Sequence, residues 1–209
     1  MAATSLKLNR NEAPDHCPSS VTEVLKSCGD LLNELEGRFG QSMSLADCRS
    51  KSKDTRQSLI KTFKLQEVKE HGKTVARGLY VMFDGSSATR ESAFYVGVSN
   101  DVPNRLSGHL AGKTPAQSSL VYLLMKRHLE EDDPSALWAK DDETGKLKEK
   151  TRKVLFAENR KYCERIAQEL MNTCRVVIQP VPDVVSLHVL EAMAAVEFKS
   201  GPWNSFRPH

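Results

Sequence analysis

Residues 75–83 read Val-Ala-Arg-Gly-Leu-Tyr-Val-Met-Phe, and residues 93–98 read Ala-Phe-Tyr-Val-Gly-Val. Both runs are rich in β-branched and aromatic residues, which favour strands, and the turn Asp84-Gly85-Ser86-Ser87 lies between them. Two such runs joined by a turn of this composition predict an antiparallel hairpin. A third apolar run, at 175–181, is ended by prolines and predicts one more strand. The sequence therefore predicts a small three-stranded antiparallel sheet.

Helical patterns flank the predicted sheet on both sides. Ser20 and Glu23 form a capping box, in which each side chain hydrogen-bonds an otherwise unpaired N–H group at the start of a helix. The apolar residues that follow recur every three or four positions, as on one face of a helix. Further helices are predicted at about 45–65, from caps at 99–101 to about 110, and from Asp183 or Ser186 to about 199. Together with the sheet, these helices predict an α+β fold.

The chain divides in two where the helical pattern gives way to strands. Residues 1–74 are predicted to form a helical, basic N-terminal arm, and residues 75–209 a second domain with a helical insertion at about 113–175. Basic residues outnumber acidic ones by nine to three in 49–77 and by eight to three in 146–165. Such an excess is typical of a solvated helix face, and it also suits contact with the phosphates of DNA.

The composition excludes some classes of protein. The chain has 209 residues, of which 39% are hydrophobic, and its net charge is only +3, so it is typical of a globular protein. It has no apolar run long enough for a membrane span, and its first residues lack the apolar stretch of a secretory signal, so we expect no signal peptide. The cysteines form no C-x-x-C pair, which argues against a zinc knuckle and favours reduced thiols. They are Cys17, Cys28, Cys48, Cys163 and Cys174. We therefore expect a cytoplasmic protein without a membrane partner.

Two short motifs on the predicted hairpin combine a glycine with a tyrosine. They are Gly78-Leu79-Tyr80 on the first strand and Tyr95-Val96-Gly97 on the second. Glycine weakens a strand, so it usually marks a bulge or a close approach of the backbone. Arg105 and His109 follow, four residues apart, and are predicted to project from one face of the next helix. Glu191 lies in an otherwise apolar turn of the last helix, where a carboxylate needs a partner or a metal ion.

In this order along the chain, the residues resemble the GIY-YIG nuclease family. The resemblance extends over residues 75–206 and rests on the two motifs together with Ser99, Arg105, His109, Glu191 and Asn204. Leucine and valine replace the two isoleucines, and the predicted loop at 81–94 is longer than usual for the family. The resemblance implies hydrolysis of DNA phosphodiester bonds with one divalent cation, Mg²⁺, for which Mn²⁺ is a substitute.

The resemblance also implies a role for each residue. Glu191 would be the metal ligand, since Mg²⁺ takes few protein ligands and keeps several waters. Arg105 would bind the scissile phosphate, because its planar guanidinium suits phosphate better than Lys does. Tyr80 would act as the general base or orient the water, which requires its pKa to fall below the usual value of about 10. The remaining expected roles are His109 taking a proton from Tyr80 or holding it in position, Tyr95 binding phosphate or water, and Asn204 orienting Glu191.

The chain is most similar to the compact type II restriction endonucleases of this family. It has no recognisable zinc finger or helix–hairpin–helix unit, and its basic segments suit double-stranded DNA. Such an enzyme acts as a homodimer on a short palindrome, because two-fold protein symmetry matches two-fold site symmetry. Two alternatives stay open: a structure-specific repair or recombination nuclease that cuts branched DNA as a monomer, and a DNA-binding module that does not cleave.

Overall fold

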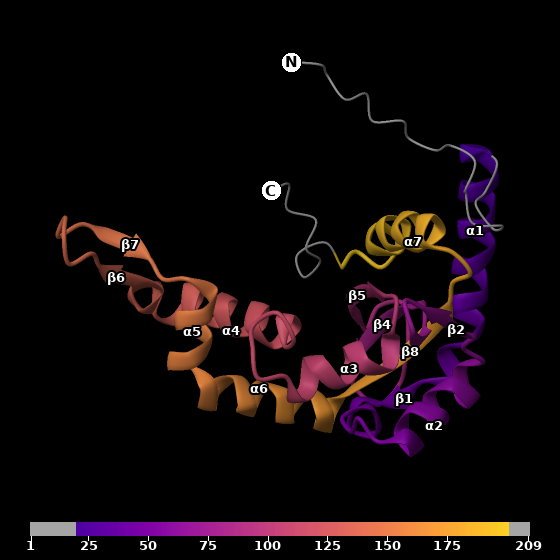
Figure 1. Ribbon diagram of the computed structural model, residues 1–209, viewed down its shortest axis with the longest axis horizontal. Coiled ribbons are helices and arrows are strands. Elements are labelled where there is room, and N and C mark those ends of the chain that lie inside the picture. Colours follow the sequence, from indigo (N-terminus) through magenta and orange to yellow (C-terminus); the bar gives the residue numbers. More distant parts are fainter. Residues whose placement is uncertain (1–19, 201–209) are drawn as a thin grey trace, which may run out of the picture.

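The computed structural model describes residues 20–200, in which a four-stranded antiparallel sheet is the centre of a mixed α+β fold (Figure 1). The strand order is β1-β8-β4-β5. The strands of this sheet are β1 (Met43–Ser44), β4 (Gly78–Asp84), β5 (Ala93–Ser99) and β8 (Cys174–Pro180). Two separate hairpins pair β2 (Glu67–Glu70) with β3 (Lys73–Ala76), and β6 (Trp138–Lys140) with β7 (Leu147–Glu149).

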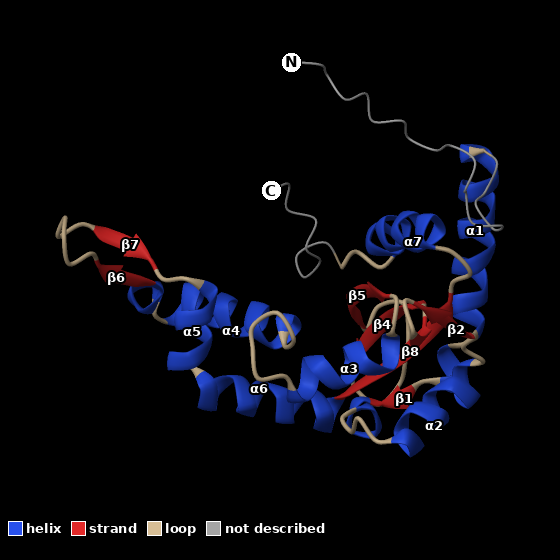
Figure 2. Cartoon of the chain, viewed as in Figure 1, coloured by secondary structure: helices blue, strands red, loops and turns tan. Residues whose placement is uncertain are grey.

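Helices cover both faces of the sheet (Figure 2). On one face are α1 (Val21–Gly37) and α7 (Val184–Glu197); on the other are α2 (Lys53–Phe63) and α3 (Val102–Ala111). An extension leads away from the sheet and consists of α4 (Ser119–Asp132), α5 (Arg152–Glu158) and α6 (Arg160–Thr173). The β6–β7 hairpin lies at its far end, opposite α1 in Figure 1. One apolar core joins the sheet to the helices and includes the four described cysteines, all buried and free.

The caps predicted from the sequence begin the helices beside the sheet. Ser20 accepts a hydrogen bond from the backbone N–H of Glu23 at 3.2 Å, and Asp183 accepts one from the N–H of Ser186 at 2.8 Å. Pro103 lies in the first turn of α3. Backbone N–H groups have no acceptor within the helix there, so the N–H group that proline lacks costs no helical hydrogen bond. Strand β4 is buried along nearly its whole length, as its continuous apolar run indicates.

The predicted number of strands is wrong, because the sheet has four strands rather than three. Met43 and Ser44 form β1, which pairs with Val176 and Arg175 of β8. The guanidinium of Arg175 also donates a hydrogen bond to the hydroxyl of Ser42 at 2.8 Å. A strand of two residues is too short to show an alternating pattern, so the sequence alone does not distinguish it from a loop.

Strand boundaries around the hairpin also differ from the prediction. The predicted strand at 75–83 is divided at Arg77, so that its first residues belong to β3 and the others to β4. The predicted loop at 81–94 is shorter, because β4 continues to Asp84 and β5 begins at Ala93. A bulge after Met82 shifts the register near this end of the pair.

The predicted helical arm and helical insertion each contain a hairpin. Residues 45–65 form a 3-10 turn (Leu45–Cys48) followed by α2, and the β2–β3 hairpin comes next. Within the insertion at 113–175, the β6–β7 hairpin separates α4 from α5. The strands of both hairpins are mostly exposed and polar, so they have no apolar face for an alternating pattern to reveal.

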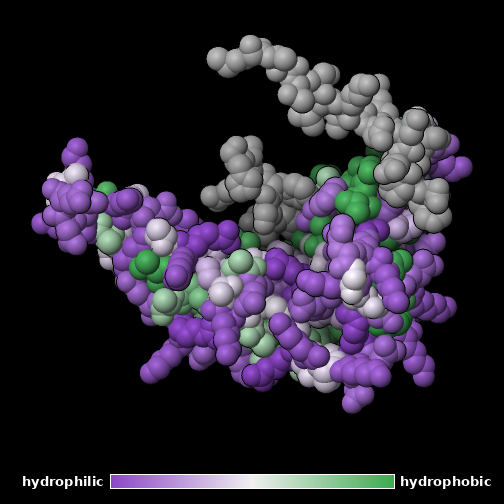
Figure 3. Space-filling model, viewed as in Figure 1, coloured by the Kyte–Doolittle hydropathy of each residue, from purple (hydrophilic) through white to green (hydrophobic). Residues whose placement is uncertain are grey.

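The surface seen in Figure 3 is largely hydrophilic, with scattered hydrophobic residues on the extension and elsewhere. Charged pairs such as Arg127 with Glu131 and Arg160 with Glu164 lie there one helical turn apart. Within residues 20–200, none of the helices combines the length and the apolar character needed to cross a membrane.

Candidate active site

Tyr80 and Tyr95 lie on the same face of the sheet, on neighbouring strands. Tyr80 is directly opposite Gly97 and Tyr95 is opposite Met82, so the tyrosines are diagonal neighbours, with ring centres 6.1 Å apart. A Cβ atom on Gly97 would lie 2.5 Å from both Cζ and Oη of Tyr80, so only glycine fits there. Gly78 is equally crowded, because its Cβ would lie 2.7 Å from a carbonyl oxygen of β8. Both motif glycines therefore mark the close approach that the sequence predicts.

His109 projects from α3 onto this pair and is fully buried. Its Nε2 atom is 2.8 Å from the Tyr80 hydroxyl, and its Nδ1 atom accepts a hydrogen bond from the backbone N–H of Leu120 at 3.3 Å. Because Nδ1 is an acceptor, a neutral imidazole carries its proton on Nε2, and this N–H donates to the Tyr80 oxygen. Burial first, and the charge of Arg105 second, lower the pKa of His109 to about 3, so the ring is neutral at neutral pH.

Arg105 brings positive charge to the same place. Its guanidinium donates hydrogen bonds to the carbonyl of Ala116 at 3.0 Å and to the hydroxyl of Ser119 at 2.6 Å. These bonds hold it near the tyrosines, where its charge acts to lower the pKa of both. We use the name tyrosine cluster for Tyr80, Tyr95, Arg105 and His109.

Both tyrosines are held in the protonated form at neutral pH. Burial is the largest effect and raises the pKa of Tyr80 well above its usual value; Tyr95 adds to this rise, and Arg105 opposes it. Burial also raises the pKa of Tyr95, again against Arg105, and the carboxylate of Glu191 adds to the rise. A Tyr80 phenolate therefore needs more positive charge nearby than Arg105 supplies.

Glu191 reaches the neighbourhood of Tyr95 from α7 and is partly buried. Burial raises the pKa of its carboxyl group, and the charge of His188 acts in the opposite direction. It forms no salt bridge with another residue in the range 20–200. A half-buried carboxylate without a counter-ion suits a cation held by one protein ligand. Since the described residues hold no group of three or more potential metal-binding side chains, water and phosphate would complete such a site.

Of the predicted site residues, the four of the tyrosine cluster come together, and the charge of Glu191 acts on one of them, Tyr95. Asn204 lies outside the described residues. Ser99 accepts a hydrogen bond from the N–H two residues later, at 3.0 Å, and so shapes the turn into α3.

Sequence reasoning missed Ser119 and the N–H of Leu120, which hold Arg105 and His109. No spacing rule links them to α3, because an irregular loop separates the two helices.

Some basic side chains of the two basic segments, 49–77 and 146–165, form ion pairs within the protein or are buried in it. In the first segment, Arg56 pairs with Asp101 at 2.7 Å, and Arg77 is nine-tenths buried. In the second segment, Lys150 pairs with Glu158 at 2.9 Å. These three cations therefore support the fold, so a polyanion, if bound here, would contact the other, exposed basic residues of the two segments.

No family model, no curated protein and no solved structure matches this chain. Its family is therefore a hypothesis that rests on the residues of the chain itself.

Proposed function

We propose that this chain is a divalent-cation-dependent endonuclease of the GIY-YIG type, which hydrolyses phosphodiester bonds in double-stranded DNA. One observation carries the proposal: the Tyr80 hydroxyl is 2.8 Å from Nε2 of His109 and lies within the influence of the Arg105 charge. This hydrolysis requires a base, a residue that orients the base, and a positively charged side chain that binds the phosphate.

In the proposed reaction, a water oxygen bonds to phosphorus and the bond from phosphorus to the 3′-oxygen breaks. Tyr80 first gives up its hydroxyl proton to solvent; the resulting phenolate takes a proton from the attacking water, and the leaving 3′-oxygen takes one from solvent. His109 donates its Nε2–H group to the phenolate oxygen, which stabilises the charged form and orients the ring. Because Nε2 already carries a proton, His109 is better suited to hold Tyr80 than to accept the Tyr80 proton.

Arg105 would bind the scissile phosphate. Two of its hydrogen bonds go to Ala116 and Ser119, and a guanidinium has five N–H groups, so others are left for phosphate oxygens. Glu191 would hold the cation through one carboxylate oxygen. When bound, Mg²⁺ supplies positive charge that stabilises the transition state and favours deprotonation of water. The same positive charge would lower the pKa of Tyr80, against the rise that burial causes.

The proposed substrate is a short palindromic site in double-stranded DNA, cut by a homodimer in the manner of type II restriction enzymes. The exposed lysines of residues 49–77 and 146–165 would neutralise backbone phosphates on either side of the reacting one. Affinity for DNA should therefore fall steeply as salt is raised.

Incubation of the purified chain with plasmid DNA and with a sequenced phage genome in Mg²⁺ tests the proposal. We expect discrete fragments whose ends share one sequence, loss of cleavage in EDTA and recovery with Mn²⁺. A preference for flaps, forks or nicks would favour the structure-specific nuclease instead. If none of these substrates is cut although DNA is bound, the chain is a non-cleaving DNA-binding module and the proposal is wrong.

A further inference from the structure

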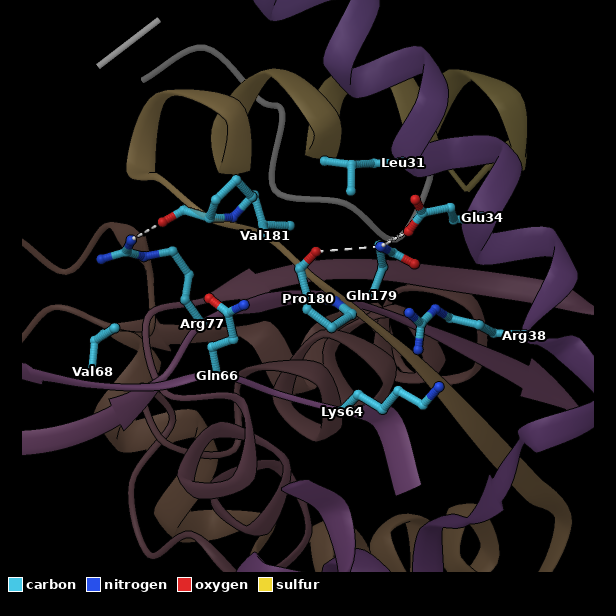
Figure 4. A pocket seen from close by; sticks show the side chains of 11 residues that line it. Leu31, Glu34, Arg38, Lys64, Gln66, Val68, Arg77, Gln179, Pro180 and Val181 are labelled. Carbon is cyan, nitrogen blue, oxygen red and sulfur yellow. Dashed lines mark hydrogen bonds between the residues drawn. The ribbon is translucent and has the colours of Figure 1, made fainter. Parts of the chain in front are cut away.

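A second polar site lies at the end of β8 and includes Gln179, whose side chain projects from the face of the sheet opposite Tyr80. It is a cavity of 260 Å³ between α1, the end of α2 and the end of β8 (Figure 4). Glu34 and Arg38 line it from α1 and its C-terminal cap, Lys64 from the cap of α2, and Gln179 from β8. We use the name Gln179 pocket for this cavity.

The amide of Gln179 is buried with half of its hydrogen bonds unmade. The side chain is 1% exposed, and its Nε2 atom donates to the carboxylate of Glu34 at 3.1 Å and to the carbonyl of Pro180 at 3.3 Å. Its Oε1 atom has no partner within residues 20–200. Exchanging the two amide atoms would set an oxygen against two acceptors, so the orientation is fixed. A buried acceptor left unpaired is unfavourable, and a donor from a bound molecule would relieve it.

Two of the three cations around the pocket remain able to bind an anion. Arg77 is occupied, because Glu70 neutralises it and its other nitrogens donate to oxygens of the protein. Arg38 gives one hydrogen bond, from Nη1 to the carbonyl of Phe63 at 3.1 Å. Lys64 is exposed and forms no salt bridge with any residue that the structure describes. Figure 4 shows Lys64 and Arg38 on the same side of the Gln179 amide.

The pocket thus offers two adjacent acceptors, Oε1 of Gln179 and the carboxylate of Glu34, and two cations. We propose that it binds a nucleoside monophosphate, with the N–H groups of the base on the acceptors and the phosphate on Arg38 and Lys64. A phosphate monoester has the charge that two cations balance, and the carboxylate beside them disfavours an anion without donors. The volume is small for a ligand site, which suits one nucleotide rather than a polymer.

Guanine matches this arrangement best among the bases. It carries a ring N–H and an exocyclic amino group side by side, which are two donors for two adjacent acceptors. Thymine presents one N–H group between two carbonyl oxygens. A carbonyl oxygen of thymine would therefore face an acceptor of the protein, either Oε1 of Gln179 or the Glu34 carboxylate, and repel it. The pocket is therefore expected to prefer dGMP to TMP. This inference does not depend on the proposed nuclease activity, since the site is on the other face of the sheet.

Titration calorimetry of the full chain with dGMP, TMP and inorganic phosphate, in EDTA, tests the proposal without any cleavage. We expect dGMP to bind most tightly, and Arg38→Gln and Lys64→Asn each to weaken it about tenfold, as expected for a lost charge-assisted hydrogen bond. Lys64 has a positive φ of 54°, which asparagine tolerates well. The matched control is Lys61→Asn, an exposed lysine of α2 that does not line the pocket and should bind dGMP like the wild type.

A third variant, Gln179→Met, should remove the preference for dGMP over TMP while the phosphate end still binds. Thermal unfolding of each variant shows whether it is folded under the conditions of the titration. The proposal is overturned if none of the three probes binds the wild type, or if dGMP binds equally to Arg38→Gln, Lys64→Asn and the wild type. Inorganic phosphate binding as tightly as dGMP would reduce the pocket to a simple anion site and overturn the assignment of a nucleotide.

Discussion

The two faces of the sheet both bury polar groups, but they satisfy them differently. On one face, the Tyr80 hydroxyl, the His109 ring and the N–H of Leu120 form a continuous chain of hydrogen bonds. On the other face, Gln179 is as deeply buried, yet its Oε1 atom has no donor in the described part of the chain. A satisfied network holds its members in one arrangement, whereas an unpaired buried atom favours binding of a donor. The comparison thus separates a preorganised centre from a pocket that a ligand would complete.

The largest expected effect is on the cation that we propose beside the tyrosine cluster. Glu191→Gln should lower the rate of DNA cleavage by more than ~10³, because an amide is a poor ligand for Mg²⁺ and the base loses the charge that favours it. DNA binding, measured by filter retention, should be nearly unchanged, since the side chain keeps its shape. Glu197→Gln is the matched control on the same helix, where the carboxylate only pairs with Arg90 at the surface. If Glu191→Gln cleaves as fast as this control, α7 contributes nothing to the centre.

Removal of Arg105, the proposed phosphate-binding residue, should have the next largest effect. Arg105→Ala should lower the rate of the chemical step by about 10²–10³, the usual range for loss of one charge-stabilising donor. Arg105→Lys should recover only part of this rate, because an ammonium keeps the charge but lacks the planar fork. Single-turnover kinetics at saturating enzyme separates these effects from binding. Full recovery by lysine would show that charge alone matters at this position.

The buried His109 predicts a loss of stability in acid. Its pKa is about 3 in the folded protein, whereas the ordinary value is 6.5, so between these values the unfolded chain binds a proton that the folded chain does not. Stability therefore falls as the pH is lowered through this window. Between about pH 7.5 and about pH 5.5 the free energy of unfolding should fall by about 1 kcal/mol from this residue alone.

His109→Gln provides the comparison, since glutamine can still donate to Tyr80 but does not titrate. Urea unfolding at both pH values should show a smaller acid-induced loss of stability in the variant than in the wild type. The other histidines are the same in both proteins, so the difference isolates His109. Equal acid sensitivity would mean that the ring is not held neutral by its surroundings.

The smallest expected effect is on the other face of the sheet. Gln179→Met replaces a buried amide, whose oxygen has no hydrogen-bond partner in the described part of the chain, by an apolar side chain of similar size. The free energy of unfolding should therefore change by less than about 1 kcal/mol, or even rise. A much larger loss of stability would show that the Gln179 amide is already satisfied, and the contrast between the two faces would disappear.

The long elements of the fold could be predicted from the sequence because they bury a continuous or periodic apolar pattern. Strands β4, β5 and β8 and helices α1, α3 and α7 all have such a pattern together with a recognisable turn or cap. Strand β1 and the two small hairpins have neither, since they are short or exposed on both faces. Their positions depend on tertiary packing, which local sequence does not express.

The candidate site was partly predictable for the same reason. The register of one hairpin places Tyr80 next to Tyr95, and helical spacing places His109 next to Arg105, so local rules suffice for these pairs. Ser119 and Leu120 come from another helix, and no local rule connects them to the cluster. The Gln179 pocket draws on α1, α2 and β8, which lie far apart in the sequence. Such a site becomes visible only in three dimensions.

The central claim is that the Tyr80 oxygen is the base of a DNA hydrolase. Tyr80→Phe removes this one atom and keeps the ring that lies over Gly97, so it tests the claim most directly. Single-turnover cleavage of plasmid DNA in Mg²⁺ should be slowed by about 10²–10⁴ in the variant, with DNA binding unchanged. Cleavage by Tyr80→Phe at the wild-type rate would contradict the claim.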